Sequence, residues 1–486
     1  MPDTESEARL ACIPATLRHV HLIGVAGTAM AALAGMLVER GFHVSGSDNQ
    51  FYEPTASLLR ASRVELKAGF AGSNLAPAPD LVVVGNVIQR VNPEAQALLA
   101  STIPYLSMPE ALWHFFLSDR KVLMVAGTHG KTTSTAMMAH VLASAGRDPS
   151  MLVGGVALDF DSNYRLGGGS YFVIEGDEYD TAFFDKGPKF LHYRAAGTIV
   201  TAVEFDHADI YRDLDHVKAS FRALANQADQ DRTLAVCADF PHALDAVKGS
   251  RAHSITFGLN RGQFRATDIR VGADGAHFDV VSEGKTVARA MHLPIGGRMN
   301  VANALGVLVL LCEFGLSVDE IARGLKSFKS VARRQQVLGE AAGVTVVDDF
   351  AHHPTAIRVT LQALGERFPG RRLLAAFEPR SNTARRNVFQ KEFGDAFAGA
   401  SRVYLGPVYF KDSDPIPPNE RLDTAALVAA IAAHGATTFA CASNEEILQR
   451  MLADCSAGDV AIFMSNGPFD GLKNRFLEAL RGRGAS

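Results

Sequence analysis

Cysteine is scarce in this sequence, and the few cysteines follow no pattern. There are five of them, odd in number, widely spaced and without a Cys-x-x-Cys pair, at Cys12, Cys237, Cys312, Cys441 and Cys455. Disulfide-stapled folds and cysteine-based zinc modules need close, repeated spacings. The sequence therefore excludes both classes, and it indicates a protein of a reducing compartment.

A dominant charge and a long apolar run are also missing. The 48 Lys and Arg residues nearly balance 52 Asp and Glu, and the formal net charge of -4 creates no field that would attract nucleic acid or an anionic membrane. The most apolar helical run, residues 301–312, is much shorter than the about 18 apolar residues of a membrane span. The acidic N-terminus has no signal-peptide pattern. We expect a cytoplasmic protein with no nucleic-acid partner and no membrane insertion.

What the chain does have is length and glycine. Its 486 residues exceed the about 250 at which a single domain usually stops growing. The 43 glycines suit the tight strand-to-helix turns of an α/β protein, and a hydrophobic fraction of 47% with a charged fraction of 21% is typical of a globular enzyme. The sequence predicts an α/β fold of two to four domains.

Three stretches of the chain repeat one pattern of an apolar strand, a tight turn and a helix. These stretches are residues 18–48, 121–145 and 343–364. Because each one begins a new domain, domain boundaries are predicted near residues 120 and 330. Further elements are expected as strands at 81–84, 171–175 and 198–203, a β-rich stretch at 264–292 and a helix at 300–314.

The second turn, GTHGKTT, lies directly between an apolar strand and a helix. In that context, loop amides and the positive end of the helix can cradle phosphates. Lys131 can neutralise the charge of the β- and γ-phosphates, and the Thr132 hydroxyl can bind Mg²⁺. The loop is shorter than the common phosphate loop, with Val125 in place of its first glycine. It predicts a nucleoside triphosphate site formed by Gly127, Thr128, His129, Gly130, Lys131, Thr132 and Thr133.

The first turn carries a weaker signal. Gly24 and Gly27 allow backbone amides to approach an anion closely. Ala26 and Met30, however, occupy two glycine positions of the full G-x-G-x-x-G dinucleotide motif. Asp48 closes the second strand, where an acidic side chain commonly binds a ribose hydroxyl. A nucleotide-diphosphate site and a simple tight turn both stay open.

Acidic side chains follow two of the expected strands. Because the carboxyl ends of parallel strands meet at one edge of a sheet, these side chains should converge there, and their oxygens suit Mg²⁺. The two groups are Glu175, Asp177, Glu178 and Asp180, and Glu204, Asp206, His207 and Asp209. They predict a metal site beside the phosphate loop, with a pair of solvated acidic turns as the alternative.

The third turn, DDFAHHP at residues 348–354, is polar and contains two adjacent histidines. No third ligand is spaced to join His352 and His353 in a transition-metal site, so we expect this turn to position a nucleotide or substrate. Planar guanidinium groups match carboxylates and phosphates bidentately. The arginines best placed for such contacts are Arg333, Arg334 and Arg380.

Taken in order, GVAGTAM, SGSD, GTHGKTT, EGDEYD, EFDHAD, GRMNVANAL and DDFAHHPT resemble the motifs of the Mur ligase family over nearly the whole chain. The resemblance implies a Rossmann-like UDP-sugar domain at residues 1–119, a central P-loop ATP-binding domain at 120–330 and a Rossmann-like peptide domain at 331–486. It implies a ligase that uses ATP and Mg²⁺ to join UDP-N-acetylmuramate to the murein tripeptide L-alanyl-γ-D-glutamyl-meso-diaminopimelate in peptidoglycan recycling. The alternative is ligation of L-alanine to the same sugar in de novo synthesis.

The resemblance also implies roles for individual residues. The expected catalytic residues are Lys131, Glu175 and His207, and the expected Mg²⁺ ligands are Thr132, Glu175 and His207. Further contacts with ATP are expected from Asn300, Asn303, Arg334 and Asp349. The residues expected to contact the UDP-sugar are Gly24, Gly27, Thr28, Ser47 and Asp48. The residues expected to contact the peptide are Arg380, Ser381 and Asn382. Met299 stands where many relatives have histidine, and Lys218 does not have the spacing of the carbamylated lysine of other branches.

Two other functions fit parts of the sequence. A dehydrogenase would use the first turn for NAD, but the dinucleotide motif there is incomplete. A nucleotide-hydrolysing switch would use the phosphate loop alone, which leaves two further domains without a task.

Overall fold

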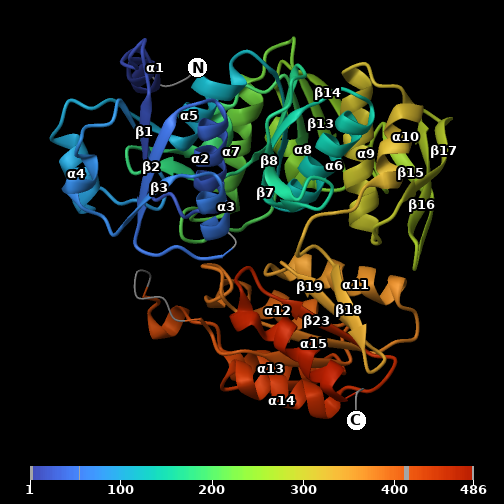
Figure 1. Ribbon diagram of the computed structural model, residues 1–486. Helices are drawn as coiled ribbons and strands as arrows, with labels where there is room; N and C mark the ends of the chain where they lie inside the picture. The colour runs from blue at the N-terminus through green and yellow to red at the C-terminus, as the bar shows by residue number, and fades with distance from the viewer. Residues whose placement is uncertain (1–3, 54, 410–414, 484–486) are drawn as a thin grey trace. The chain divides into compact units, whose positions relative to one another are not determined.

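The computed structural model describes residues 4–53, 55–409 and 415–483 and shows a mixed α/β protein built on three mainly parallel sheets (Figure 1). The chain divides into two compact units. The first comprises Met1–Glu204, Asp215–Arg265 and Leu305–Gly324, and the second Phe205–Leu214, Ala266–Ala304 and Leu325–Ser486. The α/β class expected from the sequence is confirmed, and the three strand-turn-helix stretches belong to three different sheets. The exact domain boundaries stay a prediction.

The N-terminal sheet has parallel strands in the order β3-β2-β1-β4-β5. Its strands are β1 (His19–Ile23), β2 (His43–Asp48), β3 (Glu65–Ala68), β4 (Leu81–Val84) and β5 (Tyr105–Ser107). The helices of this part are α1 (Thr4–Ala11), α2 (Thr28–Glu39), α3 (Thr55–Ala61), α4 (Pro93–Leu99) and α5 (Met108–Leu112). The strand order reverses between β1 and β4, and α/β proteins bind ligands at such switch points, beyond the carboxyl ends of the strands.

A buried polar network links the N-terminal sheet to α4. His21 of β1 and Glu94 of α4 are both completely buried, with 2.6 Å between Nε2 and Oε1. The other ring nitrogen of His21 lies 2.8 Å from the hydroxyl of Ser45. Ser47 donates its hydroxyl to Oε1 of Glu94 over 3.0 Å, and Asn74 donates its amide to Oε2 over 2.8 Å. Buried polar groups are costly unless they are bonded, so one carboxylate fixes the arrangement of β1, β2 and α4.

The central sheet is built around β6 (Lys121–Ala126), the strand that precedes the phosphate loop. Its parallel strands follow the order β14-β13-β12-β6-β9-β7, and β8 pairs with β7 in the antiparallel sense. The bounds are β7 (Ser150–Ala157), β8 (Ser162–Arg165), β9 (Tyr171–Gly176), β12 (Gly197–Val200), β13 (Thr233–Cys237) and β14 (His253–Gly258). The strand expected at 198–203 ends at Val200. The next residue, Thr201, still donates its backbone amide to Ala126 of β6 over 3.0 Å, and its hydroxyl donates to the loop carbonyl of His129 over 2.6 Å.

A small sheet, five helices and three further strands complete this part of the chain. The small sheet of β10 (Asp180–Ala182) and β11 (Asp185–Pro188) follows β9. The helices are α6 (Lys131–Ser144), α7 (Leu214–Gln227), α8 (Pro241–Val247), α9 (Arg298–Glu313) and α10 (Val318–Ser327). The β-rich stretch expected at 264–292 is confirmed as β15 (Phe264–Gly272), β16 (Gly275–Ser282) and β17 (Lys285–Leu293).

The C-terminal sheet has the order β18-β19-β23-β20-β21-β22, in which only the edge pair β18 and β19 is antiparallel. Its strands are β18 (Gln336–Ala341), β19 (Val344–Asp349), β20 (Leu373–Phe377), β21 (Arg402–Leu405), β22 (Thr437–Ala440) and β23 (Val460–Met464). One apolar cluster packs α11 (Pro354–Arg367), α12 (Gln390–Ala396) and α13 (Thr424–Ala433) on one face, and a second packs α14 (Asn444–Asp454) and α15 (Leu472–Arg483) on the other. Helices on both faces make this a doubly wound sheet. Within the described ranges, no helix combines the length and the apolar character needed to cross a membrane.

Replacing Glu94 by alanine should loosen the N-terminal sheet, because His21, Ser47 and Asn74 lose one buried partner together. Each buried group left unbonded costs about 1–3 kcal/mol. Hydrogen exchange measured peptide by peptide should therefore accelerate about a hundredfold in β1 and β2, which is equivalent to about 3 kcal/mol. The half-exposed Glu65 of β3 offers a matched control. Equal exchange in the Glu94→Ala and Glu65→Ala variants would contradict the role of the network.

Candidate functional site

The phosphate loop has the backbone geometry that its glycines allow. Gly127 has φ +138° and Gly130 has φ +80°, and Gly130 directly precedes α6. A Cβ at Gly127 would overlap the hydroxyl of Thr201 and lie 2.9 Å from the carbonyl oxygen of Ala202. Only glycine therefore fits at this position, and the loop stays close to the end of β12.

Lys131, the first residue of α6, is held between the loop and the end of β9. Its ammonium group lies 2.6 Å from the carbonyl oxygen of Gly127 and 2.8 Å from Oε2 of Glu178. Burial lowers the pKa of Lys131, but the charge of Glu178, with smaller contributions from Glu175 and Asp177, outweighs burial and raises this pKa. The lysine therefore carries a fixed positive charge at the position where a phosphate loop needs one.

Thr132 and Glu175 offer two oxygen ligands side by side. The hydroxyl of Thr132 donates to Oε1 of Glu175 over 3.0 Å, while Oε2 accepts the amide of Gly154 over 2.8 Å. Hydroxyl and carboxylate oxygens are the hard donors that Mg²⁺ prefers. The structure thus brings together two of the three expected metal ligands.

The remaining members of the first acidic group have structural partners. Asp177 lies 2.8 Å from Lys189, and Asp180 lies 2.7 Å from Lys186. Burial raises the pKa of Asp177, but the charges of Lys189 and Lys131 outweigh it and lower this pKa to about 2. These two carboxylates therefore serve as partners of lysines, whereas Glu175 and Glu178 line the loop.

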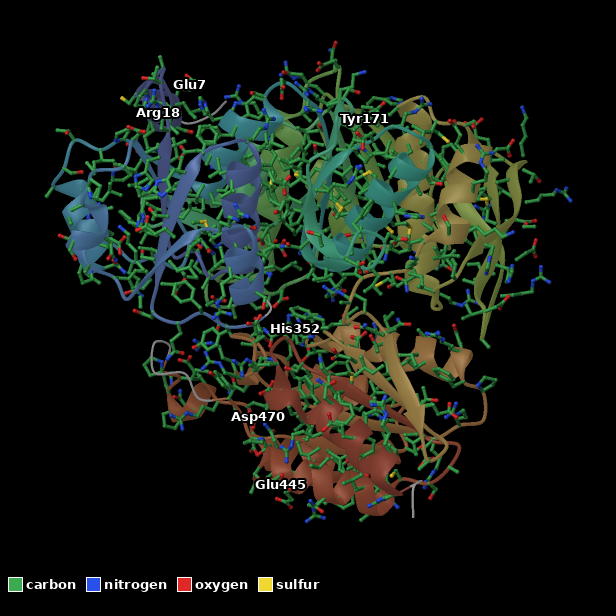
Figure 2. The ribbon with its side chains drawn as sticks, in the orientation of Figure 1. Glu7, Arg18, Tyr171, His352, Glu445 and Asp470 are labelled. Carbon is green, nitrogen blue, oxygen red and sulfur yellow. The ribbon has the colours of Figure 1, made fainter. Side chains whose placement is uncertain are left out.

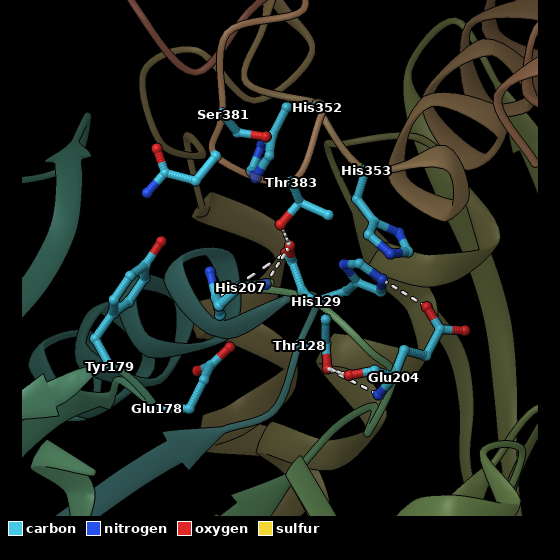
Figure 3. A network of polar contacts seen from close by, with 12 residues as sticks. Thr128, His129, Glu178, Tyr179, Glu204, His207, His352, His353, Ser381 and Thr383 are labelled. Carbon is cyan, nitrogen blue, oxygen red and sulfur yellow. Dashed lines mark hydrogen bonds and ion pairs between the residues drawn. The ribbon is translucent and has the colours of Figure 1, made fainter. Parts of the chain in front are cut away.

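Sequence reasoning gave no individual role to Glu204, which lies at the loop beside Thr128 and His129 (Figure 3). Oε2 of Glu204 is 2.7 Å from Nε2 of His129. The backbone amide of Glu204 donates to the hydroxyl of Thr128 over 2.9 Å. The signal in the sequence that could have placed Glu204 at the loop was its position after β12, the strand next to β6. The position of Glu178 after β9 was the same kind of signal.

In the second unit, the segment Phe205–Leu214 carries the rest of the second acidic group. Asp206 is buried and accepts the hydroxyl of Thr383 over 2.9 Å (Figure 3). Burial raises the pKa of Asp206, but the charges of His207, His352 and His353 outweigh it and lower the pKa below its usual range. Nδ1 of His352, a residue labelled in Figure 2, is 3.0 Å from the carbonyl oxygen of Phe350. The histidines of the polar turn before α11 therefore lie close enough to the buried carboxylate of Asp206 to lower its pKa.

The three expected peptide contacts differ in their surroundings. Arg380 is partly exposed, stacks over the ring of Tyr409 at 3.8 Å and lies 3.5 Å from Glu378. Asn382 instead donates to Asp209 over 2.7 Å. The hydroxyl of Ser381 accepts the amide of Ala384 over 3.0 Å. Asn382 and Ser381 thus have intramolecular partners, and Arg380 presents the cation.

The first turn is held by the residues expected to bind a UDP-sugar. The amide of Gly24, which has φ +84°, donates to the carbonyl oxygen of Ser47 over 2.9 Å. Asp48 accepts the amide of Ala26 over 3.0 Å, so its carboxylate holds the turn. No side chain caps α2 at Gly27, and the carbonyl oxygen of Thr28 accepts an amide from Asn163. Contacts of these residues with a nucleotide stay a prediction.

Asn300 and Asn303 lie on α9 and face each other. The amide of Asn303 donates to the side-chain oxygen of Asn300 over 3.3 Å, and Asn300 donates to the carbonyl oxygen of Gly296 over 2.8 Å. Asp349 is buried at the end of β19, where its carboxylate accepts a hydrogen bond from the backbone amide of Gln335 over 2.7 Å. Burial raises the pKa of Asp349 despite the nearby charge of Arg334.

Lys218 is engaged in an ion pair. Its ammonium group lies 2.6 Å from Asp245 and 3.6 Å from Asp215. The hydrogen bond with Asp245 raises the pKa of Lys218. Carbamylation needs an uncharged amine, so this environment disfavours the modification.

Comparisons with known proteins cover almost the whole chain. Three family profiles match it, described as Mur ligase family, catalytic domain (residues 19–120), Mur ligase middle domain (125–311) and Mur ligase, glutamate ligase domain (333–467). The UDP-N-acetylmuramate–L-alanyl-γ-D-glutamyl-meso-2,6-diaminoheptandioate ligase of Haemophilus influenzae is 34% identical over 96% of this chain and 100% of its own length. The UDP-N-acetylmuramate–L-alanine ligase of Syntrophomonas wolfei is 32% identical over 95% of this chain and 97% of its length. The crystal structure of a murein peptide ligase from Psychrobacter arcticus matches with a TM-score of 0.71 and 32% identity, covering 96% of this chain and 99% of that one.

Replacing Gly127 by alanine should weaken the binding of ATP at least tenfold, because the added Cβ forces the loop away from Thr201 and Ala202. Gly146→Ala is a suitable control, since Gly146 also has a positive φ, of +71°, but an added Cβ there meets nothing within 4 Å. The control should lose about 1 kcal/mol of stability and keep its affinity for ATP. Calorimetric titration of both variants measures the difference, and unchanged affinity of Gly127→Ala would show that the loop does not bind phosphate.

Proposed function

The chain belongs to the Mur ligase family, and on this basis we propose that it joins UDP-N-acetylmuramate to the murein tripeptide with the use of ATP. The observation that supports the proposal most directly is the charged Lys131 at the end of the phosphate loop, held by Glu178. Next to it, Thr132 bonds to Glu175 of β9. The full-length similarity to a ligase named for this tripeptide supports the choice of amine. Such an enzyme works in the cytoplasm, where it recycles peptides of the cell wall. The alternative, which the similarity to L-alanine ligases supports, is ligation of L-alanine.

The arrangement of charges suits the activation of a carboxylate. A carboxylate is a poor acyl donor, so its oxygen must first attack the γ-phosphate of ATP, with ADP leaving and an acyl phosphate forming. The loop amides and Lys131 offset the repulsion between the two anions as they approach. The amine then attacks the acyl carbon, and the same cation stabilises the tetrahedral intermediate before inorganic phosphate leaves.

Thr132 and Glu175 fit a magnesium ion. Their oxygens are already 3.0 Å apart, and the second carboxylate oxygen of Glu175 is oriented by the amide of Gly154. We assign these two residues to one Mg²⁺ and His207 to a second. Bound Mg²⁺ supplies positive charge that offsets the phosphate oxygens. Lys131 adds a positive charge that belongs to the protein and not to a bound metal ion.

Arg380 is assigned to the incoming peptide. The tripeptide carries carboxylates on its γ-linked glutamate and its diaminopimelate, whereas L-alanine carries a single carboxylate close to its amine. A guanidinium group can bind such a carboxylate bidentately. The ring of Tyr409 under Arg380 keeps the guanidinium plane oriented without neutralising it.

A ligation assay with both amines tests the proposed function. The protein is incubated with ATP, Mg²⁺ and UDP-N-acetylmuramate, together with either the tripeptide or L-alanine, and the products are identified by mass spectrometry. The proposal predicts a UDP-linked tripeptide product, formed in equal amount to ADP, and a kcat/KM at least a hundredfold lower for L-alanine. Preferential formation of the L-alanine product would support the alternative, and no amide product with either amine would refute both.

Replacing Lys131 by methionine, which keeps the length of the side chain and removes its charge, should reduce kcat about a hundredfold or more. That loss is typical when one electrostatic stabiliser of a transition state is removed. Lys186→Met is the control, because Lys186 is mostly exposed and pairs with Asp180. Steady-state kinetics at saturating ATP compare the two variants. A kcat of the Lys131→Met variant within tenfold of the parent's would contradict the role assigned to Lys131.

Replacing Arg380 by alanine should raise the KM for the tripeptide by about 10- to 100-fold, as expected for loss of a charged hydrogen bond worth about 1.5–3 kcal/mol. The KM for ATP should change little. Arg450→Ala removes an exposed arginine of the same unit, which pairs with Glu446 on α14, and should leave both KM values unchanged. A tripeptide KM equal to that of the parent would remove Arg380 from the peptide site.

A further inference from the structure

Three potential metal ligands meet at one end of β15, β16 and β17, three neighbouring strands of the ten-stranded sheet. Nε2 of His277 lies 2.9 Å from Oδ2 of Asp274, and Nε2 of His292 lies 3.1 Å from the carbonyl oxygen of Asp274. The two imidazole rings stack with centroids 4.5 Å apart and an angle of 12° between their planes. One ligand atom from each of the three side chains lies within 4.8 Å of the other two. The residues come from the turn after β15, from β16 and from β17.

The backbone presents these side chains in a fixed arrangement. His277 and His292 are direct partners in the antiparallel ladder of β16 and β17, so both rings leave the same face of the sheet. The neighbouring pairs, Ala276 with Leu293 and Phe278 with Met291, point to the opposite face and are buried. The histidine pair therefore cannot turn inward without exposing four apolar side chains.

Gly275 fixes the third ligand. It has φ +117°, and a Cβ at this position would overlap the carbonyl oxygen of Leu293 and lie 2.7 Å from the backbone of Pro294. The chain can make this close approach to β17 only with glycine. Asp274, the preceding residue, is thereby held beside both histidines.

The chemistry of the three groups matches a transition-metal ion. Two imidazoles and one carboxylate bind Zn²⁺ with bonds of about 2.0–2.2 Å, so tetrahedral ligand atoms lie about 3.3 Å apart. Nε2 of His277 and Oδ2 of Asp274 need to separate by a few tenths of an ångström to reach that spacing, and the two stacked rings must turn about their side-chain torsions so that both in-plane lone pairs point at one ion. Both Nε2 atoms face oxygen atoms of Asp274, and a bound ion would take the Nε2 lone pairs, with the ring hydrogen on Nδ1.

We propose that Asp274, His277 and His292 form a Zn²⁺-binding site that ties the β15–β16 turn to β17. Water completes the coordination, since Asp274 is exposed and the histidines are partly exposed. None of the three residues belongs to those assigned to ATP, the UDP-sugar or the peptide. The site is therefore separate from the proposed ligase reaction, and it does not depend on that function.

Metal titration of the full-length protein tests the site without nucleotide or substrate. After removal of metals with a chelator, Zn²⁺ binding is measured by calorimetry, and Co²⁺ is used as a coloured replacement whose visible absorption reports nitrogen and oxygen coordination. His277→Ala and His292→Ala should each weaken the binding of one ion at least tenfold, and Asp274→Asn should weaken it as well. Circular dichroism checks that the variants keep their fold, which is expected because the substituted side chains lie on the outer face.

A matched control distinguishes this site from a single surface histidine. Nε2 of His434 lies 2.9 Å from Oδ1 of Asp395, the same separation as in the pair of His277 and Asp274, but among the described residues His434 belongs to no group of three potential metal ligands. His434→Ala should therefore bind Zn²⁺ as the parent does. If the His277, His292 and His434 variants all titrate like the parent, or if the parent binds no Zn²⁺, Asp274 and the two histidines are only hydrogen-bonded to one another and the proposal is overturned.

Discussion

The ion pair between Lys131 and Glu178 is the interaction on which the proposed chemistry depends. A buried ammonium group is stable only when charge and hydrogen bonds compensate the loss of water. Here Glu178 and the carbonyl oxygen of Gly127 provide that compensation, and Glu175 adds further negative charge. The lysine is therefore charged and held at the loop, and under the proposed function its charge is in place before a triphosphate binds.

This arrangement follows from the order of the strands. Because β6 lies between β9 and β12, the residues that follow all three strands meet at one edge of the sheet. The loop after β6 is thereby flanked by Glu175 and Glu178 on one side and by Glu204 on the other. Thr201, the residue after β12, donates its hydroxyl to the loop carbonyl of His129, which joins the loop to the sheet. The same rule, applied to the N-terminal sheet, leaves its first turn at a switch point.

The sequence predicted the elements and the loop well, because those depend on local pattern. The strand that precedes the loop followed from an apolar run and is confirmed, and the acidic group expected at the end of the strand at 171–175 does lie beside the loop, where Glu175 bonds to Thr132. Partners far apart in the chain could not be read in this way. The hydroxyl of Ser47 bonds to Glu94, and the amide of Asn382 bonds to Asp209, so groups expected to meet ligands already have intramolecular partners. Hydrogen-bonding capacity is visible in a sequence, but its use is decided by tertiary packing.

The transfer of oxygen from the sugar carboxylate to phosphate tests the central claim most directly. UDP-N-acetylmuramate labelled with ¹⁸O in its lactyl carboxylate is incubated with the protein, ATP, Mg²⁺ and the tripeptide, and the released inorganic phosphate is examined by mass spectrometry. If the loop and Lys131 direct the γ-phosphate onto the carboxylate, one ¹⁸O atom appears in the phosphate for each amide bond formed. Amide formation with unlabelled phosphate would contradict an acyl phosphate, and with it the role assigned to the charged loop.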